Sequence, residues 1–83
     1  MVLDIRFERP MKRSLNVNGH KTSVTLETAF WQAFVAMAKA RKLTLNDFAN
    51  HIDQKRKVDC SLASAIRLYV LAHYQNLAKS DNA

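Results

Sequence analysis

Apolar and polar residues alternate on both sides of Asn18-Gly19, over residues 14–17 and 20–26. An Asn-Gly pair between two such runs is the strongest short-range signal for a β-hairpin, because a type I′ turn requires positive φ at both turn residues. A two-residue loop also fixes the register of the strands. The expected opposite pairs are Val17 with His20, Leu15 with Thr22, and Arg13 with Val24.

The predicted hairpin has one apolar and one polar face, because side chains alternate across a sheet. The apolar face carries Leu15, Val17, Thr22, Val24 and Leu26. The polar face carries Lys12, Ser14, Asn16, Lys21, Ser23 and Thr25. Both strands assign the same face to the core, which supports this register and leaves only hydrogen-bonding and cationic groups outside.

Three segments with helical periodicity follow, and they predict helices over residues 28–42, 45–55 and 61–77. We expect Thr25 or Glu27 to cap the first helix. Thr44 is expected to cap the second, with Asp47 as a capping-box partner three residues later. The predicted fold class is therefore α+β and mostly α, with a β-hairpin followed by three helices.

The third predicted helix is apolar nearly all round. Leu62, Ile66, Tyr69, Val70, His73 and Leu77 share one face, whereas Leu68 and Leu71 point elsewhere. Such a helix is normally buried. Since a short chain buries only about 60% of its unfolded surface, we expect this helix to pack against a second copy of the chain.

Both ends of the chain carry weaker signals. Residues 2–8 alternate in polarity, which predicts a half-buried strand that ends at Pro10. The expected organisation is an N-terminal strand or arm over residues 1–10, a domain over residues 11–77 and a frayed polar tail over residues 78–83.

Composition narrows the class of protein. The 83 residues carry a net charge of +6, which favours an acidic partner such as nucleic acid. The single cysteine, Cys60, excludes a disulfide framework and fits a reducing, cytoplasmic setting. No apolar run approaches the ~20 residues of a membrane span, and the charged N-terminus is unlike a signal peptide. We therefore expect no membrane association.

The run from Lys12 to Trp31, followed by the Ser61-led helix, resembles the ribbon-helix-helix DNA-binding domain. It is similar to a bacterial subfamily that carries this extended segment. The resemblance covers about residues 11–75. It implies an intertwined homodimer, in which one strand from each chain forms an antiparallel ribbon in the DNA major groove.

The resemblance also implies roles for individual residues. Base contacts fall to Lys21, Ser23 and Thr25 on the second strand, and phosphate contacts to Lys12, Arg13, Ser61 and Ser64. The expected dimer core comprises Val24, Leu26, Phe30, Phe34, Leu62, Ile66, Tyr69 and Val70. The protein would then be a transcriptional regulator that binds double-stranded DNA on the bacterial nucleoid.

Two features depart from the family pattern. The usual fold has two helices, so residues 45–55 form an extra one, and either Thr44-Leu45-Asn46 or Ser61 takes the phosphate role. The hairpin also adds a strand outside the ribbon. Four strands span about 14 Å between outer axes, against a groove about 12 Å wide. Either the first strands splay away, or the sheet sits over the groove, or DNA is not the ligand.

The alternative function is a protein-interaction or antitoxin-like adaptor dimer on the same scaffold. No enzymatic activity or cofactor is expected, because nothing in the sequence positions a catalytic base and no glycine-rich phosphate loop is present. No metal site is expected either, since His20, His51, Cys60 and His73 lack zinc-like spacing.

Overall fold

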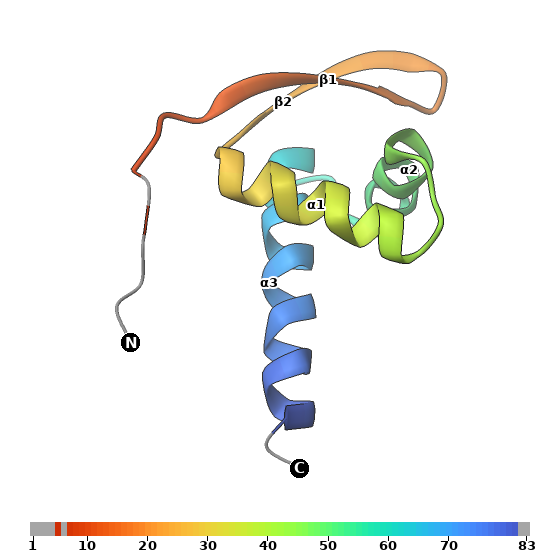
Figure 1. Ribbon diagram of the computed structural model, residues 1–83. Coiled ribbons are helices and arrows are strands. Elements are labelled where there is room, and N and C mark those ends of the chain that lie inside the picture. Colours follow the sequence, from red (N-terminus) through yellow and green to blue (C-terminus); the bar gives the residue numbers. More distant parts are fainter. Residues whose placement is uncertain (1–4, 6, 82–83) are drawn as a thin grey trace.

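The computed structural model describes residue 5 and residues 7–81. A β-hairpin of β1 (Met11–Val17) and β2 (His20–Leu26) is followed by α1 (Thr28–Ala40), α2 (Leu45–Lys55) and α3 (Leu62–Asp81). The hairpin lies across one end of the helical layer, and α3 begins beneath it and runs away from it (Figure 1). The predicted α+β, mostly helical fold is confirmed.

The hairpin has the predicted register. Val17 pairs with His20, Leu15 with Thr22, and Arg13 with Val24. The backbone φ angles of Asn18 and Gly19 are 54° and 78°, as a turn with two left-handed residues requires. The two-residue loop therefore fixes which side chains of β1 and β2 lie on the same face.

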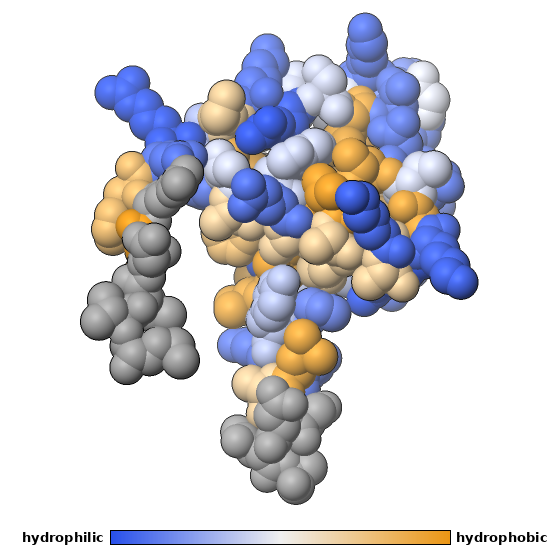
Figure 2. Space-filling view, in the orientation of Figure 1, coloured by the Kyte–Doolittle hydropathy of each residue, from blue (hydrophilic) through white to orange (hydrophobic). Residues whose placement is uncertain are grey.

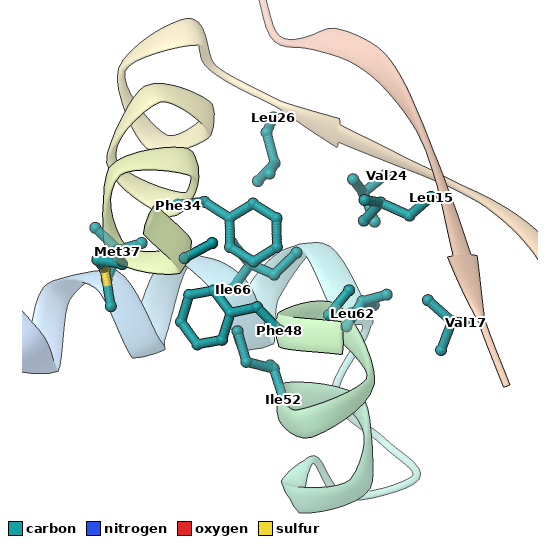
Figure 3. Close-up of a cluster of buried hydrophobic side chains, with 13 residues drawn as sticks. Leu15, Val17, Val24, Leu26, Phe34, Met37, Phe48, Ile52, Leu62 and Ile66 are labelled. Atoms are coloured by element: carbon teal, nitrogen blue, oxygen red, sulfur yellow. The ribbon is translucent and has the colours of Figure 1, made fainter. Parts of the chain in front are cut away.

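One face of the hairpin closes the core. Its buried side chains pack toward α1, α2 and the first half of α3, and they lie on one side of the stacked rings of Phe34 and Phe48 (Figure 3). The buried residues are Leu15, Val17, Val24, Leu26, Phe34, Met37, Ala38, Phe48, Ala49, Ile52, Leu62, Ile66 and Val70. No polar side chain is buried with them among the described residues.

The helix ends follow local hydrogen bonding. Thr44 caps α2 as predicted, and its Oγ1 accepts from the Asp47 amide at 3.0 Å. Glu27 occupies the N-cap of α1 without a side-chain capping bond. The end of α1 comes before the predicted residue 42, because Lys42 adopts a left-handed conformation and the Leu43 amide donates to the Ala38 carbonyl at 2.9 Å.

The predicted N-terminal strand is wrong for the described residues. Residues 5 and 7–10 form no strand, and the Phe7 side chain is 94% exposed; the remainder of residues 2–8 lies outside the described part. Alternation alone does not make a strand, because a strand needs a partner to satisfy its backbone groups.

The third helix is longer than predicted and ends at Asp81 rather than Leu77. Ala78 and Lys79 are good helix formers and no Gly or Pro interrupts the segment, so the helix continues. None of the described helices combines the length and apolar character that a membrane span requires.

Candidate nucleic-acid interface

The outward face of the hairpin presents six exposed side chains in two parallel rows. Cross-strand pairing sets Lys12 beside Thr25, Ser14 beside Ser23, and Asn16 beside Lys21. None of the six is acidic, and every one carries a hydrogen-bond donor. In Figure 2 hydrophilic residues predominate at the top of the molecule, where the hairpin lies. The ammonium, hydroxyl and amide groups of this polar face can hydrogen-bond to base edges and to phosphate oxygens.

The structure brings four of the predicted site residues together on this face. Lys21, Ser23 and Thr25 occupy alternate positions of β2, about 7 Å apart along the strand. Lys12 lies on β1 opposite Thr25.

Arg13 does not join them, because it faces the helices. Its guanidinium carbon lies 5.3 Å from the centre of the Trp31 ring, and its Nε is buried without a hydrogen-bond acceptor in the described part of the chain. Arg13 therefore packs against α1 under the hairpin instead of facing outward with Lys12.

Ser61 and Ser64 lie at the start of α3, remote in sequence from the hairpin. The Ser61 Oγ accepts from the Ser64 amide at 3.1 Å, and the two hydroxyl oxygens are also 3.1 Å apart. Ser61 therefore caps the N-terminus of α3, a role that the sequence analysis did not assign to it.

The outer edge of β1 is hydrogen-bonded to α2 at the end nearest the turn. The Asn16 amide donates to the Asn46 Oδ1 at 3.0 Å, and the Asn18 amide donates to the Asn50 Oδ1 at 2.8 Å. The Asn18 side chain also donates to Asp53 at 3.1 Å. Sequence reasoning missed these contacts, although positions 46, 50 and 53 share a helix face through their i, i+4, i+7 spacing.

The outer edge of β2 is open along most of its length. Lys21 and Ser23 belong to non-hydrogen-bonded pairs, so their backbone groups point away from β1. No hydrogen bond within the described residues satisfies these groups. Only the Thr25 carbonyl is occupied, by Arg67 Nη2 at 3.2 Å. An open edge of this kind is a template for another strand.

Arg67 ties α3 to the end of β2. Its Nε lies 2.9 Å from Glu27 Oε1, and its guanidinium also approaches the Phe30 ring. Hydrogen bonding from Arg67 lowers the pKa of the Glu27 carboxyl from its ordinary value of 4.5. The pair fixes the junction between the ribbon and α1.

Two cations near helix ends have internal partners. Arg41 Nη1 donates to the Tyr69 hydroxyl at 2.9 Å, and its guanidinium carbon lies 5.1 Å from the Phe48 ring centre. Arg56 lies 2.6 Å from Asp53. Lys39 and Lys42 are exposed near the end of α1. The residues considered for a metal do not converge: the described part of the chain holds no group of three or more His, Cys, Asp or Glu that could bind an ion.

The second half of α3 projects from the rest of the molecule and exposes apolar side chains. Leu71, Tyr74 and Leu77 are each about half exposed, at 51%, 49% and 48%. Orange, apolar residues reach the surface along this projection in Figure 2. The eight predicted dimer-core residues, in contrast, already pack within one chain; Phe30 and Tyr69 are only partly buried.

Comparison with known families identifies one match. The model for the ribbon-helix-helix domain matches residues 10–74, which include the hairpin, α1, α2 and most of α3. None of the curated proteins and none of the solved structures compared with the chain gives a match.

Proposed function

Since this chain belongs to the ribbon-helix-helix domain family, a non-enzymatic fold of DNA-binding regulators, we propose that it is a homodimeric transcriptional regulator. The observation that carries the proposal is the exposed, acid-free polar face of the hairpin. A ribbon of strands fits the DNA major groove, and cationic and hydroxyl groups match what the groove presents. The proposed place of action is the nucleoid of a bacterial cytoplasm.

The proposed base-reading residues are those of β2. Lys21 donates to guanine O6 and N7, whereas the hydroxyls of Ser23 and Thr25 donate or accept and the Thr25 methyl contacts thymine. All three side chains are exposed and lie on one row. Affinity would come mainly from phosphates, and sequence preference from this row.

Two observations support dimerisation through β2 and α3. The open edge of β2 accepts a second β2 in antiparallel pairing, which joins two hairpins into one sheet. The exposed apolar stripe of Leu71, Tyr74 and Leu77 provides a surface for α3 of the partner copy. The partly buried Phe30 and Tyr69 extend the proposed interface.

Phosphate binding is assigned to the start of α3 rather than of α2. Helix N-termini attract anions through free amides and the helix dipole. Asp47 places a carboxylate in the first turn of α2, whereas the first turn of α3 holds no acidic residue and carries Ser61 and Ser64. Arg13 is left out of the proposal because its guanidinium lies against Trp31.

The test is in vitro selection from random duplexes with the full-length protein, followed by affinity measurements over a salt series. We expect a defined sequence preference, a steep loss of affinity with salt, and loss of the preference in a Lys21→Ala, Ser23→Ala double variant. A Lys39→Ala, Gln32→Ala variant is the matched control, since it removes one exposed cation and one polar side chain from α1. Unchanged preference in the ribbon variant would refute the role of β2.

A second candidate function, protein binding, is favoured by an apolar hollow of about 290 Å³ between α2 and α3. Its lining residues are Ile52, Lys55, Arg56, Cys60, Ala65, Leu68, Tyr69 and Ala72. An apolar floor beside cations suits an amphipathic helix with acidic flanks. A fluorophore on Cys60, the only cysteine, reports occupancy by a synthetic helix of leucine and glutamate. This function would be favoured if the wild type binds the synthetic helix but no DNA duplex, and if Leu68→Lys abolishes binding of the helix.

A further inference from the structure

We infer that β1 contacts the phosphate backbone on both sides of the major groove, while β2 lies over the base edges. The inference rests on the proposed function and assigns a ligand to β1, the strand that lies beside the base-reading β2. Its basis is the outward row of β1, which consists of Lys12, Ser14 and Asn16.

Strand spacing sets this division of roles. Strands in a sheet lie about 4.8 Å apart. If two hairpins join through β2, each β2 axis lies about 2.4 Å from the dyad and each β1 axis about 7.2 Å from it. The major groove is about 12 Å wide, so its edges lie about 6 Å from the centre. The β2 rows are thus centred over the groove floor, whereas the β1 rows lie above the phosphates that border it.

The side chains of β1 match this position. The Lys12 ammonium, the Ser14 hydroxyl and the Asn16 side-chain amide can all donate hydrogen bonds, as phosphate oxygens require. These three side chains are exposed, and within the described residues none of them makes a hydrogen bond or ion pair, since the bond from Asn16 to Asn46 comes from the backbone amide. The four-stranded sheet of the dimer, which is too wide to enter the groove, therefore carries phosphate-binding groups on its two outer strands.

Contacts on the outer edge and the inner face of β1 fix the position of this strand relative to α1 and α2. Asn46 and Asn50 hold the amides of Asn16 and Asn18, and Arg13 packs over Trp31 beneath the strand. Because these bonds hold the backbone before DNA arrives, little ordering cost remains on binding. Asn46 and Asn50 thus act as positioning residues, which gives the extra helix α2 a role in DNA binding.

The test compares the salt dependence of duplex binding by single variants of the full-length protein. Lys12→Ala removes two cations per dimer, so the slope of log affinity against log salt is expected to fall by about 1.8. Its affinity should fall about tenfold or more on every sequence alike. Asn16→Asp, which places a carboxylate toward the phosphates, should weaken binding more than Asn16→Ala. Lys79→Ala, near the far end of α3, is the charge-matched control and should leave the slope unchanged.

Each outcome decides between the two proposals. If the wild type binds no duplex, the proposed function itself fails. If the wild type binds and Lys12→Ala has the wild-type slope, only the inference about β1 is overturned. If Asn16→Ala changes the preferred sequence, β1 reads bases and the division between the strands is wrong. Circular dichroism melting of each variant separates loss of folding from loss of contacts.

Discussion

At the scale of single residues, Lys42 stands out because its φ of 57° places a lysine in the left-handed region. Its amide donates to Lys39 and the next amide to Ala38, so the bend that ends α1 depends on this conformation. Glycine adopts it without the cost of about 1–2 kcal/mol that other residues incur.

We therefore predict that Lys42→Gly stabilises the protein by about 0.5–1 kcal/mol, after the larger entropy of glycine in the unfolded chain is subtracted. Urea unfolding measures the change. The reverse exchange at the hairpin turn, Gly19→Ala, should destabilise, because φ is 78° there although no atom lies within 4 Å of the added Cβ. If Gly19→Ala instead increases the free energy of unfolding, the argument that positive φ favours glycine at residues 19 and 42 is wrong.

The Glu27 carboxyl predicts a pH dependence. Arg67 lowers its pKa in the folded protein below the ordinary value of 4.5. The unfolded state therefore binds a proton more readily, so the contribution of this group is present above pH 4.5 and is lost as the pH falls through the folded pKa. The urea midpoints of the wild type and Glu27→Gln should converge in acid and separate toward neutral pH. Equal separation at every pH would rule out this linkage.

Sequence reasoning worked at residues whose environment is local. Thr44 caps α2 because its hydroxyl accepts from the amide three residues ahead, and the positive φ of Gly19 follows from the two-residue turn. It failed where the partner comes from far along the chain. The sequence does not indicate that Tyr69 and Phe48 contact the Arg41 guanidinium, because no local pattern encodes a contact across 28 residues.

At the scale of elements, the hairpin could be predicted in full because the two-residue turn and the alternation of both strands give the same register. The helix starts were also accurate, within one residue at α3. The N-terminal strand was not, since the described residues of the alternating run over 2–8, residues 5, 7 and 8, pair with no strand. The contact of α2 with β1 was missed because it depends on tertiary packing of two elements.

The hydrogen bonds from the Asn16 and Asn18 amides to α2 lead to a prediction about local stability. Removing the acceptors in an Asn46→Ala, Asn50→Ala variant costs about 1 kcal/mol per hydrogen bond. The amides of Asn16 and Asn18 should then exchange with solvent about fivefold faster or more, while amides on the β1–β2 side of the strand change less. Hydrogen exchange by NMR resolves the individual amides. Asn76→Ala on α3, an exposed asparagine away from the hairpin, is the control; uniform acceleration would indicate global destabilisation instead.

At the scale of the whole molecule, the chain is more extended than a compact chain of the same length. Its radius of gyration is 13.6 Å, whereas a compact chain of this length has about 12 Å. The second half of α3 projects away from the hairpin and the other helices (Figure 1). A single chain thus leaves Leu71, Tyr74 and Leu77 in water on the projecting helix, outside the core that the hairpin and the three helices enclose.

We predict that a second copy covers this stripe. Light scattering at micromolar concentration should give twice the 9.5 kDa of one chain, and the melting temperature should rise with protein concentration, as mass action requires for a folded dimer. Leu77→Glu places a carboxylate in the interface and should shift the mass toward that of one chain. Val58→Glu is the matched control, because Val58 is fully exposed in the loop between α2 and α3. A wild type that melts at one temperature at all concentrations, with the mass of one chain, would show that the projecting helix is stable alone. The dimer-based placement of β1 and β2 on DNA would then lose its foundation.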